Sequence, residues 1–172
     1  MRMLFTLVVG LINGCRAQDN SPTAVGSVDL TRYTGRWYDI ASFPARFQRD
    51  CHCTTADYTL TSNGYIEVVN KCRKEGFNER ESIISAKAFV VEGSNNTKLK
   101  VQFFWPLKAD YWIVKLDTAY QWAVVSSPKK DYLWLLSRTP VIEETLIESL
   151  VSSLKIEGYE TDKLRRTPQP CE

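Results

Sequence analysis

The residues of this sequence with the greatest capacity for chemistry are its five cysteines and its single histidine. Cys51, His52 and Cys53 place three sulfur and nitrogen donors in one run, which could bind zinc. Structural zinc sites, however, usually separate paired cysteines by about two to four residues and add a second ligand pair. Here one residue separates the cysteines, and the chain has no other histidine. The pattern therefore predicts disulfide bonds and no metal site.

Four cysteines remain for disulfides once Cys15, at the end of an apolar leader, is set aside: Cys51, Cys53, Cys72 and Cys171. An even number of cysteines in an exported chain favours two disulfides. Cys51 and Cys53 cannot bridge each other comfortably, because alternate residues of an extended segment lack convergent Cβ vectors. We therefore expect each to bond with a distant partner, either Cys72 or Cys171, and the order stays open.

Catalysis would require a nucleophile beside a base, or an acid and base pair. With the mature cysteines used in disulfides, the single histidine offers no such pair. We therefore predict no catalytic residues, no enzyme activity and no cofactor. The net charge of +2 and the absence of a long Lys/Arg run also argue against nucleic acid as a partner. The aromatic content of 12% instead suits the lining of an apolar pocket, although an aromatic β core explains it equally simply.

The N-terminus has the pattern of an export signal, with a basic start and an apolar run over residues 4–12. This run is too short to cross a bilayer as a helix. Two processing sites compete. Residues 12–15 resemble a lipobox, in which cleavage leaves Cys15 lipidated and the protein peripherally attached to a membrane, and a small-x-small site ends at Ala17. Residues 1–17 are thus expected to be a signal peptide, or a lipoprotein signal ending before Cys15.

The elements that must position these residues are mostly strands. A helical turn is predicted over residues 29–35, because Asp29 can cap its start and Gly35 can end it. Turn signals such as Asn63-Gly64 then separate short segments rich in β-forming residues. These expected strands are residues 37–42, 54–60, 65–71, 81–91, 98–105, 111–116, 121–126 and 132–137. Eight strands joined in sequential hairpins predict an all-β fold, an antiparallel up-and-down barrel.

The periodicity changes to that of a helix after the last strand. Thr139 and Pro140 provide a start, and Gly158 provides an end. Apolar residues recur at three- and four-residue spacing on one face: Ile142, Leu146, Ile147, Leu150, Val151 and Leu154. We expect this C-terminal helix to pack against the outside of the barrel.

Three motifs in order resemble those of the lipocalin family. Residues 35–38, Gly-Arg-Trp-Tyr, resemble the Gly-x-Trp signature of the first strand. Asp117 and Tyr120 resemble the second motif, between the sixth and seventh strands, and Arg138 resembles the third. The resemblance covers the chain from residue 29 to residue 172 and implies one lipocalin domain.

Longer stretches are similar to particular branches of the family. Residues 32–41 and 131–140 resemble bacterial outer-membrane lipocalins and apolipoprotein D-like lipocalins. Residues 50–53 and 167–172 are instead similar to plastid lipocalins of plants. The resemblance therefore implies an exported protein, anchored to the outer membrane or periplasmic in a bacterium, and otherwise secreted or in an organelle lumen. It leaves the host, and the possibility of a homodimer, open.

The same resemblance implies a barrel sealed at one end. Trp37 is expected to lie across the closed end beneath the guanidinium of Arg138, with Gly35 beside them. These three residues are structural, and a ligand is expected to enter at the opposite end.

The predicted pocket depends on which face of each strand turns inward. Lys100 and Gln102 must face water, which places Leu99, Val101, Phe103 and Trp105 inside. Lys115 marks the outer face of its strand, which places Trp112 and Val114 inside. Residues 104–107 are expected to rim the mouth and touch ligand or a membrane surface. With the positions implied by the resemblance, the predicted ligand-binding residues are Tyr58, Asn70, Phe103, Trp105, Trp112 and Val114.

We therefore predict that the protein binds and carries or stores a small hydrophobic ligand in its barrel, such as a fatty acid, a lysophospholipid or a similar lipid. Two alternatives are a lipocalin-type enzyme acting on a hydrophobic ligand and an interaction protein whose barrel is filled by its own side chains. A count of free thiols, expected to be zero, separates binding from cysteine-based catalysis.

Overall fold

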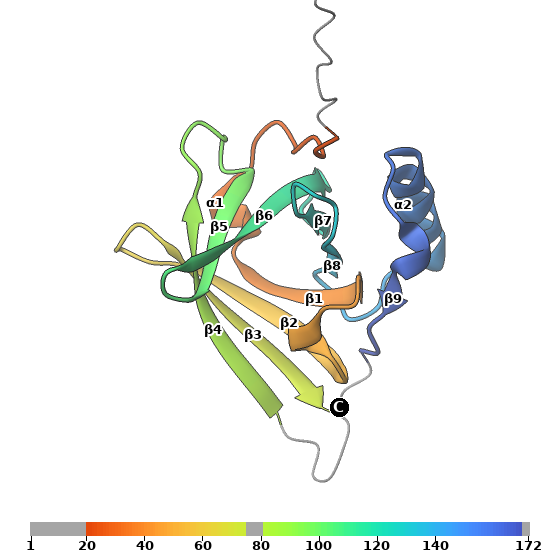
Figure 1. Cartoon of the computed structure of the whole chain (residues 1–172), viewed down its shortest axis with the longest axis horizontal. Helices are drawn as coiled ribbons and strands as arrows, with labels where there is room; N and C mark the ends of the chain where they lie inside the picture. The colour runs from red at the N-terminus through yellow and green to blue at the C-terminus, as the bar shows by residue number, and fades with distance from the viewer. Residues whose placement is uncertain (1–19, 75–80, 170–172) are drawn as a thin grey trace, which may run out of the picture.

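The computed structural model describes residues 20–74 and 81–169. The predicted leader with Cys15, and the predicted disulfide residue Cys171, lie outside this range. Within it, no helix is long and apolar enough to cross a membrane. The described chain forms a strongly curved sheet that closes on itself, with one helix outside it (Figure 1).

The sheet confirms the predicted eight-stranded antiparallel up-and-down barrel. Its strands are β1 (Gly35–Ser42), β2 (Cys51–Leu60), β3 (Ile66–Lys74), β4 (Glu81–Val90), β5 (Lys98–Phe104), β6 (Leu107–Leu116), β7 (Trp122–Ser126) and β8 (Leu133–Ser137). Each strand pairs antiparallel with the next, and β1 pairs with both β8 and β2, which closes the barrel. A two-residue strand, β9 (Arg165–Arg166), adds to β1 and was not predicted.

Sequential antiparallel strands place their connections alternately at the two ends of the barrel. The β1–β2 connection, with the 3-10 helix η1 (Arg46–Gln48), therefore shares one end with the β5–β6 and β7–β8 turns. We call this end the mouth. The β2–β3, β4–β5 and β6–β7 turns share the other end with the short helix α1 (Leu30–Tyr33), which is capped by the Asp29 side chain as the sequence predicts.

The C-terminal helix α2 (Glu144–Ile156) lies against the outside of the barrel (Figure 1). Its buried residues, Ile147, Leu150 and Leu154, belong to the predicted apolar face. The helix begins later than Thr139 and Pro140 suggested. The Thr139 hydroxyl donates to the main-chain oxygen of Val141 at 2.6 Å, and such a local bond competes with helix formation.

Apolar residues form two clusters, one inside the barrel and one beneath the helix. The buried residues of the inner cluster are Val28, Tyr33, Trp37, Ala56, Tyr58, Ile66, Val68, Ala86, Ala88, Leu99, Val101, Ile113, Ala123, Val125 and Leu136. The outer cluster joins the buried face of α2 to the barrel wall through Ile40, Ala41, Phe43, Val114, Val124, Leu133, Leu135 and Tyr159. Membership of these clusters shows which way each strand residue points.

The C-terminal segment closes the wall where β1 and β2 part. The two strands pair only from Gly35 to Tyr38 on β1. Beyond that point, the Gln169 side chain donates to the main-chain oxygens of Asp39 and Thr54, at 2.5 and 3.0 Å. This segment therefore substitutes for missing strand pairing.

Disulfides tie the same region together. Cys51 on β2 is bonded to Cys72 on β3, which agrees with one of the pairings left open by the sequence. Cys53 is disulfide-bonded as well.

Candidate ligand-binding site inside the barrel

The end of the barrel opposite the mouth is sealed by Trp37 and Arg138. The Trp37 side chain is 0% exposed, and its Nε1 donates to the main-chain oxygen of Tyr33 at 2.8 Å. The Arg138 guanidinium carbon lies 3.8 Å from the centroid of the Trp37 ring, a cation–π distance. The guanidinium also donates to the main-chain oxygens of Arg32 and Arg36, at 2.7 and 2.8 Å. This arginine therefore holds the start of β1 and the preceding helix over the barrel end.

Gly35 has a conformational reason to be glycine. Its φ of +92° lies in the left-handed region that favours glycine. A Cβ there would be in van der Waals contact with Nη1 of Arg138, at 3.4 Å, so the strain of any other residue would come from the backbone.

Three tyrosines from separate elements bring their hydroxyls together inside the barrel. Tyr33 comes from α1, Tyr58 from β2 and Tyr111 from β6. The Tyr33 and Tyr111 oxygens are 2.7 Å apart, and the Tyr58 hydroxyl donates to that of Tyr111 at 2.9 Å. Burial raises the pKa of Tyr58 to about 12 and raises the pKa of Tyr33 and of Tyr111 well above the usual value. All three are therefore neutral phenols at physiological pH.

This tyrosine cluster has a hydrogen-bond donor to spare. Each phenol carries one O–H hydrogen, so the cluster has three hydrogens for the two bonds among its members. Among the described residues, one O–H hydrogen, on Tyr33 or Tyr111, is left over whichever way their shared bond runs. The cluster can therefore donate one hydrogen bond to an acceptor oxygen on a ligand.

The inner wall around the tyrosine cluster is mostly apolar, and several of its side chains are small. Four alanines belong to the inner cluster: Ala56, Ala86, Ala88 and Ala123. Ala86 lies opposite Val68, which in turn lies opposite Tyr58, so the three form one row across β2, β3 and β4. The interior of an eight-stranded barrel is either filled by side chains or holds one small ligand, and alanines leave the most room.

Several predicted pocket residues do face the interior. Tyr58 belongs to the inner cluster, and Phe103 packs against it. Leu99 and Val101 also belong to it. Asn70 lies two residues beyond inward-facing Val68 on an unbroken stretch of β3, and therefore shares its face.

The prediction that Trp112 and Val114 point inward is wrong. Val114 belongs to the outer cluster, and Trp112 packs against that cluster. The Lys98 ammonium lies 3.8 Å from the centroid of the Trp112 ring. The cause is a bulge in β6, where the register shifts between Ile113 and Lys115. Val114 and Lys115 both face outward there, so Lys115 could not indicate the orientation of the residues before the bulge.

The same bulge explains the inward position of a residue that was not predicted to line the barrel. Tyr111 and Ile113, rather than their neighbours, turn into the barrel. Alternation counted backward from Ile113 would have found Tyr111, but nothing in the sequence marks the bulge.

Trp105 was also predicted to point inward, and it does not. The register of β5 and β6 shifts between Val101 and Phe104, and β5 ends at Phe104. Trp105 then lies in the β5–β6 turn with its side chain 87% exposed.

An unexpected carboxylate faces the interior nearer the mouth. Asp39 lies opposite the inner-cluster residue Leu136 and is almost completely buried. Its Oδ2 accepts from Ser42 at 3.1 Å and from Gln48 at 3.3 Å, and Gln48 in turn accepts from the Trp134 indole at 3.0 Å. Its Oδ1 has no hydrogen-bond partner among the described residues. Burial raises the pKa of Asp39 to about 7.

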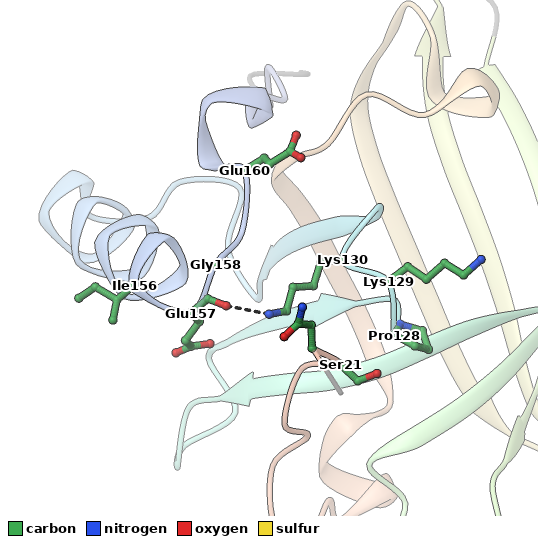
Figure 2. Close-up of a pocket in the computed structure, with 9 residues that line it drawn as sticks. Ser21, Pro128, Lys129, Lys130, Ile156, Glu157, Gly158 and Glu160 are labelled. Carbon is green, nitrogen blue, oxygen red and sulfur yellow. Dashed lines mark hydrogen bonds between the residues drawn. The ribbon is translucent and has the colours of Figure 1, made fainter. Parts of the chain in front are cut away.

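A hollow outside the barrel has a different character. It lies between the end of α2 and the β7–β8 turn and measures about 720 Å³ (Figure 2). Lys130 crosses it and donates to the main-chain oxygen of Glu157 at 2.7 Å (Figure 2). Its lining is Asn20, Ser21, Pro128, Lys129, Lys130, Ile156, Glu157, Gly158 and Glu160. This polar, charged surface does not suit a hydrophobic ligand.

A closed eight-stranded barrel with one end sealed by a Trp–Arg stack and one helix outside is the architecture of lipocalins. The chain belongs to this family, since the family model described as "Lipocalin-like domain" matches residues 28–169. Lipocalins are known as proteins that bind small hydrophobic ligands.

Similar proteins come from bacteria, plants and animals. "Outer membrane lipoprotein Blc" of Vibrio cholerae is 36% identical, over 95% of this chain and 96% of that protein. "Temperature-induced lipocalin-1" of Arabidopsis thaliana is 40% identical, over 84% of this chain and 81% of that protein. "Apolipoprotein D" of Mus musculus is 33% identical, over 98% of this chain and 95% of that protein. The resemblances to bacterial outer-membrane lipocalins and apolipoprotein D are thus confirmed.

Solved structures agree on the fold. Insecticyanin from the tobacco hornworm superposes with a TM-score of 0.66 at 19% identity, covering 86% of this chain and 82% of its own. Lobster apocrustacyanin A1 gives a TM-score of 0.66 at 15% identity, covering 88% and 91%. At these identities the likeness concerns the barrel alone.

Proposed function

We propose that this protein binds a single-chain lipid, such as a fatty acid or a lysophospholipid, inside its barrel and carries or stores it after export. The observation that carries the proposal is the tyrosine cluster, with one unused O–H donor among the described residues and a mostly apolar inner wall around it. The apolar wall would hold the hydrocarbon, and the spare hydroxyl would donate to one ligand oxygen. Because the phenols are neutral, they do not repel a carboxylate.

The competing hypothesis is a barrel filled by its own side chains, which would make the protein an interaction partner. Full burial of Ala88, Leu99 and Val125 favours it.

We propose no enzymatic step, because the disulfide-bonded cysteines and the lone histidine provide no nucleophile and base pair. Two variants test the lipid-binding proposal against the filled barrel.

Removing the three hydroxyls should weaken binding of ligands that carry an acceptor. The triple variant Tyr33→Phe, Tyr58→Phe and Tyr111→Phe keeps the ring volumes and removes all three donors. We expect fatty acid affinity to fall about tenfold or more, while an alkane-chain probe without polar atoms keeps its affinity. Isothermal titration measures both. Trp112→Phe, next to Tyr111 but outside the barrel, is the matched control and should change neither. Equal losses for both ligands would contradict the donor role.

Enlarging Ala86, which lies in one row with Val68 and Tyr58, should show whether the barrel interior is open or packed. In an open barrel, Ala86→Phe shortens the available space, so long fatty acids lose affinity while short ones do not. Wild-type affinity should rise by up to about 0.8 kcal/mol per added methylene until the interior is full, and the variant should reach its limit at a shorter chain. In a packed barrel, the extra ring instead lowers the free energy of unfolding by about 1–3 kcal/mol, and no chain-length series is seen.

A further inference from the structure

The β5–β6 turn presents an apolar tip to solvent. Phe104, Trp105 and Leu107 are 76%, 87% and 75% exposed, and Pro106 lies between them. Phe104 pairs with Leu107 across the turn, so the ladder between the two strands holds the tip in place. Three large apolar side chains within four residues form a continuous patch, unlike the isolated apolar residues common on protein surfaces.

This tip is at the mouth of the barrel, and cationic side chains accompany it. The β5–β6 turn shares the mouth with the β1–β2 connection, which carries the exposed Arg46 and Arg49. Lys108 directly follows the tip, with its ammonium 4.2 Å from the centroid of the Phe89 ring. In Figure 1 the turn lies on the far side of the barrel from α2, so the helix does not cover it.

The size and composition of the tip favour a lipid surface over a protein partner. A stable protein interface buries about 800 Å² on each partner and uses roughly 20–30 residues a side, which a four-residue turn does not supply. Aromatic side chains next to lysine and arginine are instead typical of segments that lie at the membrane–water interface. A bilayer can accept a small wedge, because lipids rearrange around it.

We propose that the tip, residues 104–107, inserts into the headgroup region of a phospholipid bilayer and holds the mouth of the barrel against the membrane. Lys108, Arg46 and Arg49 attract anionic headgroups at the same face. The use of this docking rests on the proposed function: a lipid could pass between the bilayer and the barrel without crossing water. Docking itself depends on the tip and not on the barrel interior.

Vesicle sedimentation tests the proposal. Every variant starts at residue 15, after the expected lipoprotein signal, and carries Cys15→Ser, so that neither the apolar leader nor an acyl group contributes. The vesicles are phosphatidylcholine with and without phosphatidylglycerol. We expect binding that is stronger with phosphatidylglycerol, and Trp105→Ser should lower the partition coefficient about tenfold or more. Val141→Ser is the matched control, because Val141 is 78% exposed in the connection between β8 and α2, at the sealed end of the barrel. It should leave the partition coefficient unchanged.

A solution assay separates this inference from the proposed function. Trp105→Ser should bind a soluble fatty acid as the wild type does, while losing vesicle binding. Unchanged vesicle binding by Trp105→Ser would overturn the proposal, and so would an equal loss with Val141→Ser. Loss of fatty acid binding in solution alongside vesicle binding would assign the tip to the ligand site and overturn it too. If the barrel binds no lipid but vesicle binding still depends on Trp105, docking stands and the proposed function fails.

Discussion

Replacing Trp37 by Ala is expected to lower the free energy of unfolding by about 3–5 kcal/mol. The indole is completely buried and its N–H is bonded to Tyr33, so the variant loses apolar burial and leaves a carbonyl short of one donor. Arg138 also loses the ring beneath its guanidinium. Urea denaturation followed by far-ultraviolet circular dichroism measures the change. A loss below about 1 kcal/mol would contradict the sealing role.

A double-mutant cycle tests whether Trp37 and Arg138 act together. Arg138→Ala removes the stack and the hydrogen bonds to Arg32 and Arg36, so it should destabilise the protein on its own. The double variant should lose less than the sum of the two single losses, by about 0.5 kcal/mol or more, because each contact needs both residues. Arg36→Ala is the control. Its ion pair with Asp57 is partly exposed to solvent, and surface pairs contribute up to about 1 kcal/mol.

The stability of the protein should fall as the pH rises from about 4 to 7, and Asp39 should be responsible. Burial raises its pKa in the folded state from 3.8 to about 7, so between these values the folded protein holds a proton that the unfolded chain has released. The folded state binds more protons, and raising the pH therefore favours unfolding. At about 1.4 kcal/mol per pH unit, the total is on the order of 4 kcal/mol, fully lost above pH 7.

Asp39→Asn provides the comparison, because it keeps the shape of the side chain and cannot ionise. The variant should match the wild type near pH 4 and exceed its stability at pH 8. Other carboxylates contribute in both proteins, such as Asp57, whose pKa its partner Arg36 lowers and which gives the opposite slope. The informative quantity is therefore the difference between variant and wild type in urea melts across the pH range. A difference that is constant with pH would contradict the role of Asp39.

The architecture could be predicted from local patterns in the sequence. Turn residues such as Asn63 and Gly64 and the β-rich runs between them mark hairpins through local backbone preferences. The apolar spacing of Ile147, Leu150 and Leu154 marks the buried face of a helix. These signals are local, because each depends only on neighbouring residues, and they remain legible without a fold. They sufficed for eight strands, their order and the helix outside the barrel.

The side chains that form the site depend instead on contacts between distant parts of the folded chain. The bulge at Val114 exchanges Trp112 for Tyr111 on the inner face, because inserting one residue reverses every side chain before it. Tyr33, Tyr58 and Tyr111 are far apart in the sequence, and only barrel closure brings their hydroxyls within hydrogen-bonding distance. The environment of Asp39 is likewise made by Gln48 and by the chain around it once folded. Register and closure arise from pairings between distant strands, which no local pattern in the sequence records.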